Sequence, residues 1–86
     1  MSQGQGVVRV RLFAAAKSAA GTSEVELEAG TIATISAALV AQYPALAAVL
    51  PACSFLIDGL QAGQEPSRTR VEAGSVVDVL PPFAGG

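Results

Sequence analysis

The stretch VVRVRLF at residues 7–13 decides the fold class, because apolar and other residues alternate from Val8 onward. Alternation at period two is the pattern of a β-strand with one buried face. The face expected to be buried carries three aliphatic side chains, Val8, Val10 and Leu12. The other face carries two arginines and an aromatic ring, Arg9, Arg11 and Phe13. The chain therefore begins its fold with a half-buried strand.

A second alternating stretch, EVELE at residues 24–28, is expected to pair antiparallel with the first. Its valine and leucine would point inward and its three glutamates outward. The glutamates would then lie near Arg9 and Arg11, and opposite charges facing each other across a strand pair stabilise a sheet. We therefore favour sheet stabilisation as the role of both arginines, with partner binding as the alternative.

Helical signals lie between the strands. The alanine-rich residues 14–20 end at Gly21, which is typical of a short helix with a glycine cap. Thr31 is the expected N-cap of the main helix, which ends at Tyr43 because the residue before a proline disfavours helical geometry. Its apolar residues recur at helical spacing and predict a buried stripe, formed by Ile32, Ile35, Leu39 and Tyr43. A further short turn is expected at residues 46–50.

The remaining strands complete the sheet. A strand over residues 53–58 ends at Asp58-Gly59, a strong turn signal. Residues 60–70 are irregular and polar, with room for a short edge strand. After a tight turn, residues 76–80 form the last strand, with Val77 and Val79 expected to face the helix and Val76, Asp78 and Leu80 to face away. One main helix on one face of such a sheet is an α+β arrangement in a single domain, residues 7–80.

Composition excludes several function classes. The 86 residues carry five basic and seven acidic side chains, no histidine and one cysteine. This argues against nucleic acid as a partner, and against a histidine-based triad or a Cys/His zinc site; we expect no metal. Cys53 is interpreted as a small apolar residue of the interior. No apolar run is long enough to cross a membrane, and residues 1–6 look like a disordered start without a signal sequence, so a cytoplasmic protein is expected.

The last six residues, Pro81-Pro82-Phe83-Ala84-Gly85-Gly86, form a distinct segment. Two prolines cannot continue a strand as donors, so the last strand is expected to end at Leu80. Prolines favour an extended chain, and six extended residues reach about 20 Å. Two terminal glycines would allow close approach of another backbone and leave the carboxylate unhindered. Residues 81–86 are thus predicted to be a flexible, projecting tail.

The sequence resembles the MoaD/ThiS family of ubiquitin-like sulfur carriers, and most closely the small subunit of molybdopterin synthase. Residues 8–14 resemble the first strand of that family, and residues 55–59 resemble its central strand and turn. The ending is close to the family's Pro-Pro-Val-Ala-Gly-Gly, with Phe83 at the valine position. The resemblance runs from about Val7 to Gly86. It implies a ubiquitin-like β-grasp fold with a mixed sheet of four to five strands.

The resemblance also implies a chemical cycle. An E1-like enzyme using ATP would adenylate Gly86, next to Gly85, and sulfur from a sulfurtransferase would convert the end to a thiocarboxylate. The tail would then enter the large subunit of molybdopterin synthase, in a heterotetramer, and donate sulfur to a pterin precursor. The carrier itself would bind no cofactor and would be no enzyme, because the catalytic groups belong to the partner.

Partner contacts in this family lie on the exposed sheet face beside the tail. By this resemblance the partner-binding residues would be a surface group and the start of the tail: Phe13, Leu60, Leu80, Pro81, Pro82, Phe83 and Ala84. Three other functions stay open. They are a sulfur carrier for thiazole or cysteine synthesis, a ubiquitin-like modifier joined to lysines through Gly86, and a plain interaction domain that does not need Gly85 and Gly86.

Overall fold

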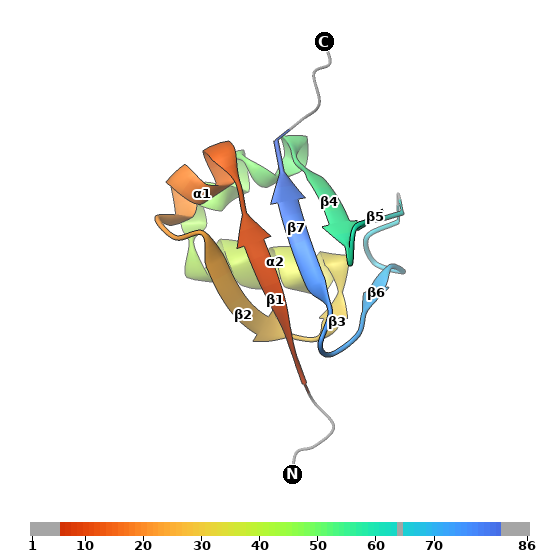
Figure 1. The fold of residues 1–86 in the computed structure, drawn as a ribbon. Coiled ribbons are helices and arrows are strands. Elements are labelled where there is room, and N and C mark those ends of the chain that lie inside the picture. The colour runs from red at the N-terminus through yellow and green to blue at the C-terminus, as the bar shows by residue number, and fades with distance from the viewer. Residues whose placement is uncertain (1–5, 64, 82–86) are drawn as a thin grey trace.

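The alternating stretch forms strand β1 (Val7–Leu12), which lies inside a five-stranded sheet (Figure 1). The computed structural model describes residues 6–63 and 65–81. The strand order is β2-β1-β7-β4-β5, with β2 at Glu24–Glu28, β7 at Val76–Leu80, β4 at Ser54–Ile57 and β5 at Leu60–Gln61. Only the β1–β7 pairing is parallel, and the other three are antiparallel. This is the mixed sheet expected of a β-grasp fold.

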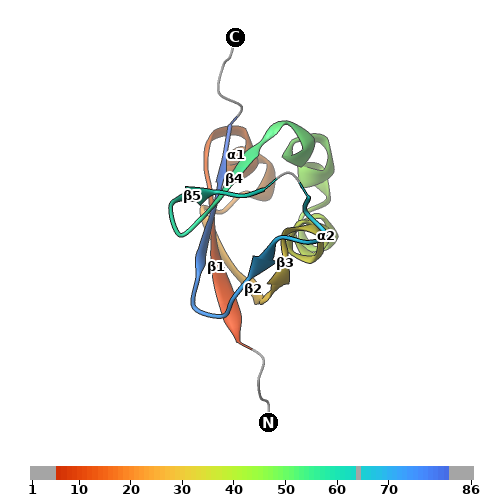
Figure 2. The same cartoon turned by 90° about the vertical axis from the view of Figure 1, so that its right-hand side faces the viewer.

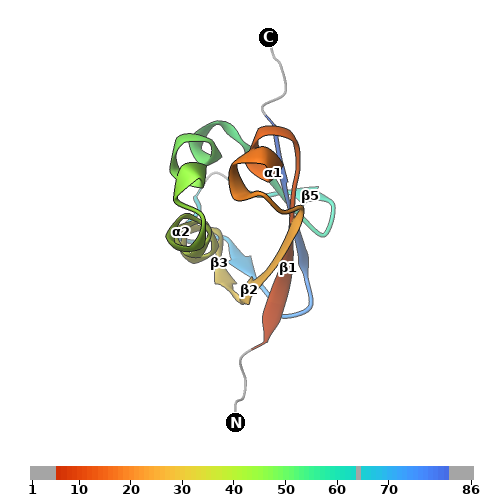
Figure 3. The same ribbon diagram turned by 90° about the vertical axis from the view of Figure 1, so that its left-hand side faces the viewer.

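The helices lie on one side of this sheet. Figures 2 and 3 view it from its two edges and show α2 (Ile32–Gln42) on one side, while no helix covers the other. The short helix α1 (Ala14–Ala20) ends at Gly21, which has the left-handed φ of 76° that favours glycine. Two 3₁₀ turns, η1 (Pro44–Ala48) and η2 (Leu50–Ala52), connect α2 to β4.

The start of α2 is fixed by its own sequence. Thr31 and Thr34 form a reciprocal capping box: the Thr34 amide donates to the Thr31 hydroxyl at 3.1 Å, and the Thr31 amide donates to the Thr34 hydroxyl at 2.9 Å. Two helix-start N–H groups thereby find acceptors. The prediction of Thr31 as the N-cap is confirmed.

The core lies between α2 and the sheet, and the expected strand faces are confirmed. Two neighbouring central strands supply residues that are fully buried, Val8, Val10, Leu12, Val77 and Val79. The helix contributes its predicted stripe, in which Ile32, Ile35 and Leu39 are buried and Tyr43 packs at the margin. Since apolar burial is the main favourable term in folding, this layer stabilises the domain.

A second, two-stranded sheet was not expected from the sequence. Strand β3 (Gly30–Thr31) pairs antiparallel with β6 (Arg70–Val71), so the irregular segment 60–70 carries two separate strand pieces rather than one. The same segment also caps α2, because the Ile32 amide donates to the Thr69 carbonyl at 2.9 Å and the Ala33 amide to the Pro66 carbonyl at 3.0 Å. Pro66 and Thr69 are therefore held by backbone partners that are distant in sequence.

Two boundaries differ from the sequence-based expectation. Gly6 was assigned to the disordered start, but its carbonyl accepts from the Ala29 amide at 3.0 Å, immediately beyond the pair of Val7 with Glu28 that ends the β1–β2 ladder. Strand β4 begins at Ser54, one residue later than expected. The rest of the expected disordered start, residues 1–5, lies outside the described residues.

The Asp58-Gly59 turn joins β4 to β5 as predicted. Both residues have positive φ, 51° and 87°, which a two-residue hairpin loop of this type requires. Asp58 also holds β7: its amide donates to the Val76 carbonyl at 2.8 Å, and its carboxylate accepts from the Val76 amide at 2.9 Å. The hydrogen bond from the Val76 amide to the carboxylate lowers the pKa of Asp58, and a hydrogen bond with the Ser75 side chain lowers it further.

We expect Val10→Glu and Val79→Glu to unfold the domain, because each would place a charge in the layer between the sheet and α2. An unpaired buried charge of this kind should destabilise the protein by about 3 kcal/mol or more. Circular dichroism during chemical denaturation measures the loss. A Val10→Glu protein with native stability would show that the strand faces are assigned the wrong way round.

We expect the stability contributed by the Asp58 carboxylate to be present at neutral pH and lost in acid. Its folded-state pKa is lowered, so the contribution persists above the unfolded pKa and disappears as the pH falls through the folded one. Asp58→Asn keeps an acceptor and tolerates positive φ but removes the charge. Its melting temperature should therefore lie below that of the parent at pH 7, and the difference should shrink as the pH falls through the lowered folded-state pKa of Asp58. A gap that is independent of pH would contradict this role.

Candidate functional site

The sheet face opposite α2, called here the outer face, is covered by no helix of the described residues. Its residues form rows across the strands. Arg11 pairs in register with Glu24 on one side and Asp78 on the other, and Asp78 continues to Leu56. In the next row Phe13 donates its amide to the Val79 carbonyl at 3.2 Å, which sets it beside Leu80. Polar and apolar rows therefore lie next to each other.

The apolar patch of this face consists of Phe13, Leu56 and Leu80. The ring of Phe13 is exposed, and Leu56 and Leu80 are half-buried although no helix covers this face. Phe13 and Leu80 were predicted here from strand phasing, and the structure brings them together on neighbouring strands. Leu56 was missed. Its signal was present, because in β4 Phe55 and Ile57 share the rows of Val79 and Val77 on the helix side, which leaves Leu56 facing outward.

The strand register places Leu60 outside this patch. It pairs with Ile57, whose own row contains Val77 of the helix side, and it lies at the hairpin end of the sheet with 74% of its surface exposed. Gln61, one residue later, shares the row of Leu56 and Asp78 on the outer face. The structure thus brings together two of the three predicted surface residues and sets Leu60 at the margin.

An ion pair borders the apolar patch. Arg11 donates from Nε to Oδ1 of Asp78 at 2.6 Å and from Nη2 to Oδ2 at 2.9 Å. The carboxylate of Asp78 is nearly buried, with 13% of its side chain exposed, while the Arg11 side chain is 50% exposed. These bonds to Asp78 raise the pKa of the Arg11 guanidinium. Its central carbon also lies 5.9 Å from the centre of the Phe13 ring.

The two arginines of β1 therefore have different partners. Arg9 forms the expected ion pair with a glutamate of β2, since its Nε lies 2.7 Å from Oε2 of Glu24. Arg11 is bound instead across the parallel pairing to Asp78. The sequence suggested only the first arrangement, because β7 lies far along the chain from β1.

The predicted tail, residues 81–86, follows Leu80 of the apolar patch directly in sequence. Strand β7 ends at Leu80 as predicted, and Pro81 is half-buried at its end. The other residues assigned to the tail, Pro82, Phe83, Ala84, Gly85 and Gly86, lie outside the described residues. The structure therefore places Pro81 directly after the central strand of the sheet, one residue beyond Leu80, which lies beside Phe13.

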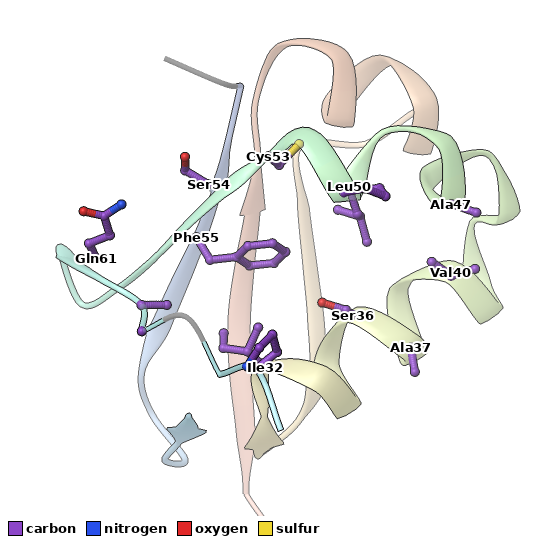
Figure 4. A pocket seen from close by; sticks show the side chains of 14 residues that line it. Ile32, Ser36, Ala37, Val40, Ala47, Leu50, Cys53, Ser54, Phe55 and Gln61 are labelled. Carbon is purple, nitrogen blue, oxygen red and sulfur yellow. The ribbon is translucent and has the colours of Figure 1, made fainter. Parts of the chain in front are cut away.

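A groove of about 900 Å³ lies on the helix side, between α2, the 3₁₀ turns and β4. The Phe55 ring points into it, whereas Ser54 and Gln61 point away (Figure 4). Among the described residues that line it, the only titratable side chain is that of Cys53, whose thiol lies 3.3 Å from the Val49 carbonyl and whose pKa is raised by burial. A thiol with a raised pKa is a poor nucleophile. The groove therefore holds no acid–base pair.

Within residues 6–63 and 65–81, no group of three metal-ligating side chains gathers at one place. Among the same residues, no helix has the length and apolarity required to span a bilayer.

Comparison with known proteins identifies the family. The model described as "ThiS family" matches residues 10–86, which is most of the chain and includes its last residue. The chain belongs to the ThiS family. It accordingly belongs to a family of small ubiquitin-like carrier proteins and has the β-grasp fold. No curated protein sequence gives a significant match.

Solved structures resemble the fold of this ThiS family member over nearly its whole length. The small archaeal modifier protein 1 from Methanosarcina acetivorans is 27% identical, with a TM-score of 0.82, over 98% of this chain and 100% of that one. A proposed molybdopterin converting factor subunit 1 from Pyrococcus furiosus is 18% identical, with a TM-score of 0.79, over 91% and 99%. The complex of subunits 1 and 2 of the molybdopterin-converting factor from Helicobacter pylori 26695 contains a chain that is 21% identical, with a TM-score of 0.67, over 93% and 99%.

We expect Phe13→Glu and Leu80→Glu to leave the isolated ThiS family domain folded. Both side chains lie on the outer face, where a new carboxylate stays hydrated, so the free energy of unfolding should change by less than about 1 kcal/mol. Thermal melts followed by circular dichroism provide the measurement, with Val79→Glu as the matched buried control on the same strand. Loss of the fold in Phe13→Glu would show that the outer face is part of the core.

Proposed function

We propose that this chain is a sulfur carrier whose C-terminal Gly86 is converted to a thiocarboxylate, and that it serves as the small subunit of molybdopterin synthase. The observation that carries the proposal is the ThiS family match, which extends to Gly86. The fold supports it, because the chain leaves the sheet from the central strand β7, directly after an apolar patch suited to a partner. The likeness to molybdopterin converting factor subunits supports the choice of pathway.

The chemistry would take place on partner enzymes. A carboxylate is a poor electrophile, so an E1-like enzyme would first join Gly86 to the AMP portion of ATP, with release of pyrophosphate. A persulfide sulfur from a sulfurtransferase would then attack the carbonyl carbon and expel AMP. Cleavage of the S–S bond by a thiol would leave the thiocarboxylate. This chain contributes binding and a reactive end rather than acid–base groups.

The large subunit would be the recipient. In this proposal the tail Pro81–Gly86 enters its active site and donates sulfur to a pterin precursor. The Helicobacter pylori structure is a complex of subunits 1 and 2, which supports a large-subunit partner for this chain as well. The apolar patch of Phe13, Leu56 and Leu80 would dock on the partner and hold the tail in register with that site.

A second candidate function is protein modification. The structures described as small archaeal modifier protein 1 are 24–27% identical to this chain, which exceeds the identity of the molybdopterin converting factor subunits. A modifier would use the same adenylated Gly86 but transfer it to lysines. It would produce high-mass conjugates in cells, whereas a carrier changes only its own end.

We expect the intact chain to gain about 16 Da when it is incubated with an E1-like enzyme, ATP and a persulfide donor, because sulfur replaces one oxygen. Intact-mass spectrometry measures the change. Deletion of Gly85 and Gly86 should abolish the gain while leaving the free energy of unfolding within about 0.5 kcal/mol of the parent, because glycines bury little area. An unchanged mass with an enzyme active on another carrier would refute the proposal, and conjugates to lysine in its place would favour the modifier.

We expect Leu56→Glu and Leu80→Glu to weaken binding to the activating enzyme or the large subunit by about 2 kcal/mol or more, because each charge would be desolvated at the centre of the interface. Leu60→Glu should have a smaller effect, since Leu60 lies outside the rows of the patch. Calorimetric titration provides the affinities. If Leu60→Glu is the most damaging change, the docking surface is centred on the hairpin instead.

A further inference from the structure

The Arg11–Asp78 ion pair uses one side of the Arg11 guanidinium and leaves its far end able to bind another group. A guanidinium has five N–H donors, arranged so that carboxylates can bind it in pairs of parallel bonds. Asp78 uses one such pair, formed by Nε and Nη2. Within residues 6–63 and 65–81, these are the hydrogen bonds that the guanidinium makes. The pair of donors at its far end, on Nη1 and Nη2, has the spacing that suits a second carboxylate.

The position of Arg11 makes this second pair of donors relevant to docking. Asp78 fixes the guanidinium in place, since its carboxylate is nearly buried and bound at two points. The next row of the outer face holds Phe13, whose ring centre is 5.9 Å from the guanidinium carbon, together with Leu80. A partner that covers this apolar patch would also remove water from Arg11. Donors on a charged group that lose water without gaining an acceptor weaken an interface.

The neighbouring ion pair provides an internal comparison. Arg9 and Glu24 lie 2.7 Å apart, and their side chains are 54% and 48% exposed. Both are therefore solvated, and the row of Arg9 contains Glu26 and Val76 rather than the apolar patch. Exposed pairs of this kind contribute little to affinity or stability. Arg9 therefore lies away from the apolar patch in a solvated ion pair, whereas Arg11 is bound at two points to Asp78 beside Phe13.

We propose that Arg11 is a specificity determinant of the outer face, and that the partner presents a carboxylate to its second pair of donors, beside apolar side chains that cover Phe13 and Leu80. This inference rests on the proposed carrier function, because it concerns the partner that activates Gly86. Asp78 is a positioning residue in it, since it orients the guanidinium. The arrangement selects against partners with a purely apolar or a basic surface at this point.

The test uses the full chain, its E1-like activating enzyme and two matched double variants. Arg11→Leu/Asp78→Leu removes the ion pair without leaving either charge unpaired, and Arg9→Leu/Glu24→Leu does the same for the comparison pair. Circular dichroism first establishes that each is folded. The KM for the carrier, the kcat for thiocarboxylate formation and the Kd by calorimetry are then measured.

We expect the Arg11/Asp78 double variant to raise KM and Kd by about tenfold or more, the loss typical of a hydrogen-bonded charge pair, with kcat unchanged because Gly86 is untouched. The Arg9/Glu24 double variant should stay within about twofold of the parent. Arg11→Lys keeps the charge but lacks the planar donors, so it should also raise KM and Kd. It serves as the test if the double variant is unstable.

Two results would overturn the inference, and they differ from failure of the proposed function. If the Arg11/Asp78 double variant binds as tightly as the parent or more tightly, the ion pair only supports the sheet. If Arg11→Lys is fully active, the second pair of donors is not used. In both cases the parent still gains a thiocarboxylate. If the parent itself gains none, the carrier function is wrong and this inference with it.

Discussion

The parallel pairing of β1 with β7 is the interaction on which the rest of the structure depends. It places Val10 beside Val77 and Leu12 beside Val79 at the centre of the sheet, and all four side chains are fully buried. The pairing joins the first and last strands of the domain. The elements between them must therefore fold so that β7 returns to lie beside β1. It also fixes the point at which the chain leaves the sheet, directly after Leu80.

The same pairing gives the two sheet faces their separate roles. Each buried residue of β1 and β7 is followed by one that faces outward, because side chains alternate along a strand. The helix-side residues hold the fold, and the outward ones create the rows of Arg11 with Asp78 and of Phe13 with Leu80. A domain of this size has little interior to spare for a walled active site. The proposed recognition on a flat face and the proposed chemistry on a terminal residue suit this limitation.

The position of the apolar patch also explains why the fold suits a carrier. Leu56 and Leu80 lie on the adjacent strands β4 and β7, and Phe13 directly follows β1 and is hydrogen-bonded to β7, so the backbone of the sheet fixes their spacing. A partner that binds these three side chains would therefore contact the sheet directly before Pro81, where the chain leaves β7. The groove beside Phe55 on the helix side has no comparable relation to the end of the chain.

The sequence by itself determined the local elements, since each depends on neighbouring residues. Alternation in β1 and β7, the Thr31 cap, the Asp58-Gly59 turn and the end of the last strand before Pro81 were all predictable, and the family resemblance followed from the ending. Only the tertiary structure decided which distant residues meet. Arg11 binds Asp78, 67 residues away, instead of a glutamate of β2; Leu56 joins the patch and Leu60 does not; β3 pairs with β6. The reason is that strand order and register depend on how the whole core packs. The pattern of a short segment does not specify which distant segment it pairs with.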